Sequence, residues 1–391
     1  MAPPFSREEY ANRLTRVRNA MQSKELDVLV IGDPANINWL TGYDAWSFYT
    51  PQIMVVGLEL DPTWLGREMD AGAADFTTYL PPEQIVPFPE THVQQATFHA
   101  AQYMGDWMKL KGLNGKRIGY ESDVYFLTPA AVGHLMDRTP NSEWTDCGLL
   151  VNWQRLTKSP AEIRMLQQAS VIAGKAMQTA YDGVRPGVRQ CDLMADVVAA
   201  QIRGTPEFGG EQTALHPLVL AGEAASTAHP MWTDAPFEKD QTIAFELGGC
   251  RKRYNVGLAR TVHLGDPPQI LMNTAKAVGE GMDEVLSAMK AGALCCDVHA
   301  AWQAVLDQYG LEKKSRIGYS IGAGYSPDWG EHTISFRPDD GTALPENAVV
   351  HIILGMWMDG WGMELSETIH VRANDAACLT QFPRNVHVID V

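Results

Sequence analysis

The feature that most constrains the fold is a weak internal repeat in the second half of the chain. The stretch RPGVRQCDLMADVVAA at 185–200 matches KAGALCCDVHAAWQAV at 290–305, and the match aligns Gly187 with Gly292. A cysteine followed by an aspartate lies four residues after each glycine. The match predicts that this part of the chain contains two copies of one structural unit. The alternative is chance similarity, because the shared pattern Gly-x-x-x-Cys-Asp is short.

The sequence around the two copies follows the same order. A long helical pattern precedes each glycine, and we expect Asp192 and Asp297 to be the N-cap residues of shorter helices. β-rich sequence follows each copy, at 213–263 and at 331–372. Two related α-plus-β halves would place a site between them, where strands of both halves face each other.

The first part of the chain has a different pattern, in which strands alternate with helices. This alternation predicts an α/β domain over about the first 150 residues. The helices are expected at 7–25, 98–111 and 129–137, and the strands in LDVLVIGD, QIMVVGLEL and KRIGYES. The proline-rich stretch YLPPEQIVPFPE is interpreted as a surface connection.

The motif LTKSPAEIRMLQQA marks the boundary between the two parts. Ser159 is placed to cap a helix, Pro160 to occupy its first position and Glu162 to complete a capping box. This helix is expected to extend to about Tyr181. We therefore predict an α/β N-terminal domain over residues 1–156 and a duplicated α+β domain over residues 157–391.

Composition limits the possible partners of the chain. A length of 391 residues predicts two domains, and 45% hydrophobic with 20% charged residues is typical of a soluble globular protein. The net charge of −16 argues against nucleic acid, which requires clustered lysine and arginine. The N-terminus has no apolar core of the kind a signal peptide needs, and no window approaches the ~18 apolar residues of a membrane span. The six cysteines lack the spacing typical of metal sites. We expect a cytoplasmic protein with reduced thiols.

Four polar side chains within apolar β-type stretches are candidates for chemistry. Their residues are His229, Glu246, Arg337 and Glu367. Each has a structural alternative: a lone histidine is more often structural, the glutamates could face solvent, and the arginine could end a surface strand. A histidine, two glutamates and an arginine that converge in one cleft would supply an acid or base, a nucleophile and anchors for both charges.

The same stretches resemble the creatinase and aminopeptidase P superfamily, the pita-bread hydrolases, over the whole chain. Metal-dependent members of this superfamily carry five ligands to two metal ions. In this chain the resemblance places those ligand positions at Glu246, Gly257, Tyr319, about Ile353 and Glu367. Only two of the five keep a carboxylate, and the histidine is replaced by tyrosine. The resemblance therefore implies that no metal is bound.

This pattern is similar to the metal-free creatinase branch, in which a histidine transfers the proton. The resemblance places His229 at that histidine, Arg337 at the arginine that binds the substrate carboxylate, and Phe48 near an aromatic residue supplied by a partner subunit. Two residues that hold the guanidinium group in creatinase fall on Ala259 and about Thr50. A substrate like creatine is therefore not expected.

Longer strings resemble the ectoine hydrolases, namely RIGYSIGAGYSPDWGEHT, PANINWLTGYDAWSFYTPQIM and FELGGCRKRYN. This resemblance implies a homodimer without a cofactor that opens the cyclic amidine of ectoine or 5-hydroxyectoine. Glu246 would be the nucleophile or the base and His229 the acid; the expected substrate contacts are Trp46, Phe48, Tyr319, Arg337 and Glu367. Two alternatives remain: a metal-dependent peptidase of the same fold, and a non-enzymatic binding module.

Overall fold

The computed structural model describes residues 3–391. The chain forms two compact units, Met1–Arg155 and Leu156–Val391. Within the described residues, no helix has the length and apolar character needed to cross a membrane. The six cysteines are free thiols.

The N-terminal unit is a mixed six-stranded sheet covered by helices on both faces. The strand order is β4-β3-β2-β1-β5-β6, where the strands are β1 (Val28–Ile31), β2 (Ile53–Gly57), β3 (Thr63–Arg67), β4 (Ile85–Phe88), β5 (Arg117–Tyr120) and β6 (Glu143–Asp146). The helices are α1 (Arg7–Ser23), α2 (Pro34–Thr41), α3 (Ala71–Thr77), α4 (Ala100–Leu110), α5 (Pro129–Arg138) and α6 (Leu150–Arg155). Alternate residues of β1 enter different cores: Leu29 packs with α1 and α2, and Val30 with α4 and α5.

The structure confirms the predicted α/β class but corrects one segment. The proline-rich stretch that we interpreted as a surface connection contains β4, which pairs with β3 in parallel. Pro87 is tolerated there because β4 is an edge strand, so no further strand needs a hydrogen bond from the N–H that proline lacks.

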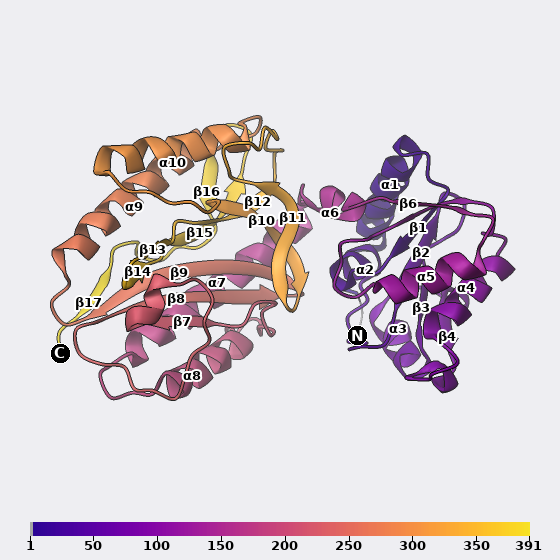
Figure 1. Cartoon of the computed structure of the whole chain (residues 1–391), viewed down its shortest axis with the longest axis horizontal. Coiled ribbons are helices and arrows are strands. Elements are labelled where there is room, and N and C mark those ends of the chain that lie inside the picture. Colours follow the sequence, from indigo (N-terminus) through magenta and orange to yellow (C-terminus); the bar gives the residue numbers. More distant parts are fainter. Residues whose placement is uncertain (1–2) are drawn as a thin grey trace. The chain divides into compact units, whose positions relative to one another are not determined.

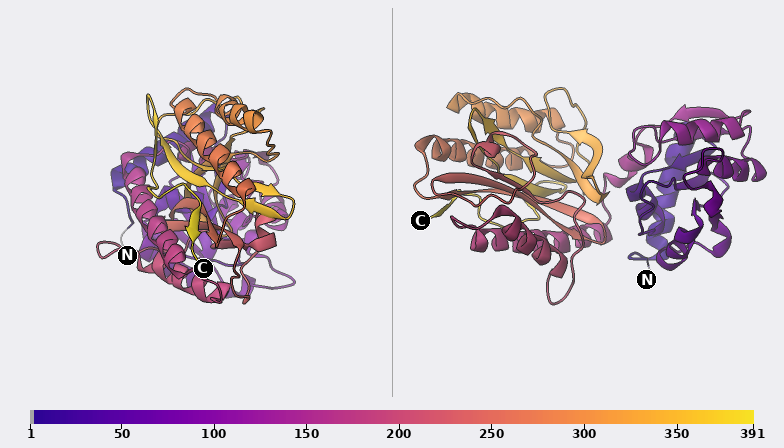
Figure 2. Two further views of the ribbon diagram at one scale, coloured as in Figure 1. Left: turned by 90° about the vertical axis from the view of Figure 1, so that its left-hand side faces the viewer. Right: turned by 60° about the horizontal axis from the view of Figure 1, so that its bottom comes forward.

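The C-terminal unit consists of two helix pairs around one large sheet. The helices are α7 (Pro160–Gly183), α8 (Gln190–Arg203), α9 (Gln269–Ala288) and α10 (Cys295–Tyr309). Figure 1 shows α7 and α8 on one side of the strands and α9 and α10 on the other, and Figure 2 shows the same layers from two further directions.

The sheet of this unit has nine strands in the order β16-β15-β12-β10-β9-β8-β7, with β11 beside β10 and β17 beside β9. The first half contributes β7 (Leu218–Ala221), β8 (Gln241–Arg251) and β9 (Tyr254–Leu264). The second half contributes β10 (Gly318–Tyr325), β11 (Asp328–Ser335), β12 (Val349–Ile353), β15 (Ser366–Val371), β16 (Ala376–Cys378) and β17 (His387–Ile389). A separate hairpin is formed by β13 (Met356–Met358) and β14 (Trp361–Met363).

The hydrogen bonds at the repeated motifs support the duplication. Gly187 N donates to Phe237 O, and at the second copy Gly292 N donates to Leu344 O. Both glycines have positive φ, and the N-cap residue of each following helix forms an isolated β-bridge. The two motifs therefore make the same turn into their helices.

The predicted capping role of the two aspartates is wrong. The N-cap residues are Arg189 and Leu294, and neither makes a side-chain cap hydrogen bond. Asp192 and Asp297 lie within the first turns of α8 and α10. A carboxylate in the first turn still stabilises a helix through its dipole, which explains why the residue type misled the capping interpretation.

The cap of α7 follows the prediction. Ser159 Oγ accepts a hydrogen bond from Glu162 N, and Ser159 N donates a hydrogen bond to the Glu162 carboxylate at 2.8 Å. We expect Ser159→Ala to lower the free energy of unfolding by about 1 kcal/mol, a shift of roughly 2–4 °C in thermal unfolding. Exposed Gln167→Ala on the same helix is the control; an equal effect of both substitutions would contradict the cap's contribution.

Candidate active site

The register of the β8–β9 hairpin decides which side chains share a face. Glu246 pairs with Ala259, and Gly248 with Gly257, so these four residues lie on one face. Phe245 pairs with Arg260 on the opposite face. The Glu246 side chain is only 4% exposed, and its carboxyl group makes no hydrogen bond within residues 3–391.

A second buried carboxyl group, that of Glu364, lies close enough to interact electrostatically with Glu246. Thr261 holds its backbone, because Oγ1 bonds both Glu364 N and Glu364 O at 2.9 Å. The Trp357 indole donates to Glu364 Oε1 at 2.9 Å, and Oε2 is buried with no hydrogen-bond partner in the described chain. Glu246 is the one acidic residue in the sequence of the hairpin, and the fold supplies a second, Glu364, from the segment just before β15.

Burial dominates the ionisation of this carboxyl pair. Desolvation, and then the charge of Glu364, raise the pKa of Glu246 well above its usual range. Desolvation raises the pKa of Glu364 to about 7, although the Trp357 hydrogen bond and the Lys313 charge oppose this shift. Two buried carboxyl groups that interact with each other cannot both ionise readily without a cation. The pair is therefore protonated at acidic pH and ready to ionise when a cation arrives.

His351 on β12 is a neutral imidazole that contacts Tyr319 and Ser366. Complete burial lowers its pKa to about 3. Nε2 is 2.8 Å from Ser366 Oγ, and Nδ1 is 3.3 Å from Tyr319 Oη. His351 thus shares one hydrogen bond with Ser366, whose Oγ also accepts from Ala259 N, and one with Tyr319.

Tyr319 completes this network. Its hydroxyl oxygen also accepts from Trp329 Nε1 at 2.9 Å. Desolvation, followed by the charge of Glu246, raises the pKa of Tyr319, so the group stays neutral and can donate a hydrogen bond.

Two glycines make room for these rings. A Cβ on Gly257 would lie 2.8 Å from His351 Cε1, and a Cβ on Gly248 would lie 2.7 Å from Trp329 Cζ3. Real side chains do not approach that closely, so both positions must lack a side chain while the rings occupy their present places.

Glu367, predicted to contact the substrate, is instead engaged elsewhere. Its Oε1 forms ion pairs with Arg260 at 2.7 Å and Arg384 at 3.0 Å, and Thr380 donates to Oε2. Arg260 lies on the face of the hairpin opposite Glu246. The neighbouring Ser366, not Glu367, contacts His351, because successive strand residues point to opposite sides.

The remaining predicted residues are spread over both units. His229 is exposed in the loop after the 3₁₀ turn Gly222–Ser226, and no hydrogen bond within residues 3–391 joins it to Glu246. Arg337 is exposed at the end of β11, where Nε donates to Ser335 Oγ at 3.0 Å. In the N-terminal unit, Trp46 is half-buried and Phe48 is 77% exposed with a φ of 54°.

Comparison with known proteins identifies the family. A model of metallopeptidase family M24 matches residues 164–373, more than half of the chain, and a model of the creatinase/prolidase N-terminal domain matches residues 13–157. This chain belongs to metallopeptidase family M24.

Two relatives match this M24 hydrolase along almost its whole length. An uncharacterized hydrolase/peptidase of Sinorhizobium fredii is 39% identical, with 99% of each chain covered. The ectoine hydrolase of Halomonas elongata is 38% identical, with 98% of each covered. The prolidase structure from Thermococcus sibiricus has a TM-score of 0.85 at 16% identity, covering 97% of this chain and 99% of that one, and shows the same fold.

The residues of this M24 hydrolase do not fit the metal centre that its family name implies. No group of three or more histidine, cysteine, aspartate or glutamate side chains in the described part of the chain is arranged to hold a metal ion. Gly257 offers no donor atom, and the adjacent space is filled by the His351 ring. The Glu367 carboxylate is already bound by two arginines.

The sequence analysis missed Glu364, His351 and Ser366. A signal for Glu364 and Ser366 was present in GMELSETIHV, the stretch around Glu367, because it carries several polar residues and alternate residues of a strand share a face. His351 lies in the apolar run VVHIILG and gave no such signal.

The fit between Gly257 and the imidazole can be tested by adding one methyl group. Gly257→Ala should displace the His351 ring and lower the free energy of unfolding by about 1–3 kcal/mol. Gly279→Ala is the control, because a Cβ there meets nothing within 4 Å and should be neutral or stabilising in α9. Chemical denaturation measures both. If Gly257→Ala is as stable as the wild type, the close packing described here is incorrect.

The carboxyl pair predicts a pH dependence of stability. The pKa of Glu364 is raised on folding, so the folded protein binds more protons than the unfolded chain between about pH 4.5 and 7. Stability contributed by this group is therefore present below about pH 4.5 and lost as pH rises through 7. Wild type should lose stability relative to Glu364→Gln across this window in denaturation at fixed temperature. A constant difference between the two proteins would contradict the raised pKa.

Proposed function

We propose that this M24 hydrolase opens a cyclic amidine by hydrolysis without a metal ion, with ectoine and 5-hydroxyectoine as substrates. One observation carries the proposal: Glu246 and Glu364 form a buried carboxyl pair, and no cation is paired with Glu246 in the described chain. An amidinium is a planar cation whose N–H groups suit carboxylate oxygens. The full-length similarity to the Halomonas elongata ectoine hydrolase supports this choice of substrate.

Charge explains why such a site would work without metal ions. The ectoine ring carries its positive charge over both nitrogens, which makes C2 electrophilic before any catalyst acts on it. A metal dication near the ring would repel it; even unit charges 4 Å apart interact by about 4 kcal/mol at an effective dielectric of 20. A carboxyl pair attracts the cation, and the cation in turn favours ionisation of the pair.

The reaction consumes one water molecule. An oxygen adds to C2, the bond from C2 to one ring nitrogen breaks, and C2 becomes an amide carbonyl. The leaving nitrogen takes up two protons, both supplied overall by the water, and becomes an ammonium group. Glu246 either attacks C2 itself or removes a proton from the attacking water. His229 is proposed to protonate the leaving nitrogen, and its exposure in a loop leaves it free to exchange protons with solvent. The product is an N-acetyl-2,4-diaminobutyrate, whose isomer depends on which nitrogen leaves.

Aromatic residues of the N-terminal unit are proposed to cover the cation. Phe48 is 77% exposed, and a positive φ is unusual for phenylalanine, so the backbone holds an apolar ring towards solvent at a conformational cost. Trp46 lies two residues away. In the proposed cytoplasmic homodimer, these rings would cover the site of the partner subunit, where a cation–π contact contributes about 0.5–2 kcal/mol.

Ectoine turnover by the purified protein tests this function. We expect wild type to convert ectoine to N-acetyl-2,4-diaminobutyrate, detected by mass spectrometry, with no requirement for added metal and no inhibition by chelators. Glu246→Gln should abolish turnover, and His229→Ala should lower kcat by about 10²–10⁴-fold. Gln167→Ala is the matched surface control. Absence of ectoine turnover, or two tightly bound metal ions required for it, would contradict the proposal.

A trapped intermediate would separate the two roles of Glu246. If Glu246 is the nucleophile, wild-type enzyme quenched with acid during turnover of ectoine should carry a covalent adduct between the Glu246 carboxylate and C2 of the substrate, visible in the intact mass. A base would leave the protein mass unchanged. If Glu246→Gln keeps more than about a tenth of wild-type kcat, neither role is correct.

A further inference from the structure

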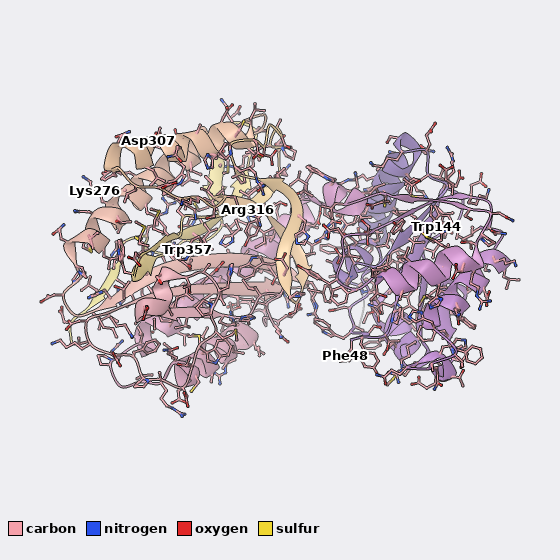
Figure 3. All side chains as sticks on the ribbon, viewed as in Figure 1. Phe48, Trp144, Lys276, Asp307, Arg316 and Trp357 are labelled. Atoms are coloured by element: carbon pink, nitrogen blue, oxygen red, sulfur yellow. The ribbon has the colours of Figure 1, made fainter. Side chains whose placement is uncertain are left out.

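Arg316 is a charged residue at the site that the resemblance did not assign. It lies two residues before β10, and its guanidinium carbon is 4.6 Å from the centroid of the Tyr319 ring. Figure 3 labels it in the C-terminal unit together with Trp357, the residue that binds Glu364. Arg316 is exposed and forms no ion pair with any residue between 3 and 391. Its charge is therefore available to a ligand.

The Tyr319 ring links Arg316 to the carboxyl pair. One face of the ring carries the guanidinium group, while the hydroxyl group is bonded to Trp329 and His351. The hydroxyl group is also close enough to Glu246 for the carboxylate charge to affect its ionisation. A positive group thus packs on the face of the Tyr319 ring, and the hydroxyl end of the same side chain lies within electrostatic reach of Glu246.

Arg337, the anchor implied by the resemblance, is engaged differently. Its Nε donates to Ser335 Oγ, and the carboxylate of Asp340 lies within electrostatic reach. Arg316 Nη1 is 3.5 Å from the same hydroxyl oxygen. Two guanidinium groups therefore approach the Ser335 hydroxyl group, and neither forms an ion pair within residues 3–391. An anion bound there would relieve their repulsion, and arginine is well suited to grip a carboxylate with two parallel N–H bonds.

We propose that Arg316 binds the carboxylate of the substrate and makes the enzyme specific for zwitterionic cyclic amidines. The inference rests on the proposed function, because the carboxyl pair must take the amidinium end of the same molecule. The carboxyl pair would then bind the positive amidinium, and Arg316 would bind the negative carboxylate of the same small ring. An amidine without a carboxylate would satisfy only the carboxyl pair and would leave Arg316 without a partner.

The experiment compares two substrates: ectoine and the same ring without its carboxylate, 2-methyl-1,4,5,6-tetrahydropyrimidine. Arg316→Gln should raise KM for ectoine roughly ten- to hundredfold, the usual cost of losing a hydrogen-bonded charge pair, with a smaller change in kcat. Arg316→Lys should give an intermediate KM, because it keeps the charge but loses the planar fork. The carboxylate-free ring should react poorly with wild type and Arg316→Gln alike. Exposed Arg164→Gln on α7 is the control.

The outcomes of this experiment separate failure of the inference from failure of the proposed function. If wild type does not hydrolyse ectoine, the proposed function fails and the inference fails with it. If wild type is active and Arg316→Gln leaves KM for ectoine unchanged, the inference alone is overturned. It is also overturned if Arg337→Gln, rather than Arg316→Gln, removes the preference for ectoine over the carboxylate-free ring. Unchanged thermal unfolding of Arg316→Gln shows that a loss of binding is not a loss of folding.

Discussion

The burial of two neighbouring carboxyl groups without a cation on Glu246 is the constraint on which the site depends. Removing carboxylates from water is unfavourable, and Glu364 has one buried oxygen without any hydrogen-bond partner in the described chain. Both groups are held in place by the fold despite this cost. Glu246 lies within a long β-hairpin, and the backbone of Glu364 makes two hydrogen bonds to the Thr261 side chain. A bound cation would offset much of the cost. The pair is therefore better explained by ligand binding than by stability.

The departure from the metal-binding pattern of the family is coupled to this arrangement. The glycine at 257 removes a potential ligand and at the same time creates the space that the His351 ring fills. The imidazole then fixes Tyr319 and Ser366, two residues that cannot replace the missing acids but can hydrogen bond. A residue without a side chain at position 257 therefore supplies no side-chain ligand and leaves room for a neutral polar network.

The sequence predicted local features well and non-local ones poorly. The capping box at Ser159 and the alternating strands of the N-terminal unit depend on neighbouring residues, so their patterns were visible. Glu364, from the segment before β15, and His351, on β12, are far from Glu246 in the sequence, and only the fold brings these segments together. Ser366 and Glu367 show how much depends on the register of a strand. Ser366 faces His351, whereas the next residue, Glu367, points to the other side of the sheet and pairs with Arg260. The interpretation of 79–90 as a loop failed because an edge strand tolerates proline.

If the carboxyl pair is the cation site, a cation that binds there must ionise a pair that is protonated beforehand. Stopped-flow mixing of enzyme and ectoine in weak buffer near pH 6, with a pH-indicator dye, measures this directly. Opening ectoine to N-acetyl-2,4-diaminobutyrate leaves the net charge unchanged, so steady turnover should release no protons. We expect a rapid initial release of about one proton or more per subunit, and a smaller release from Glu364→Gln. If wild type binds ectoine and releases no proton, the carboxyl pair is not the cation site.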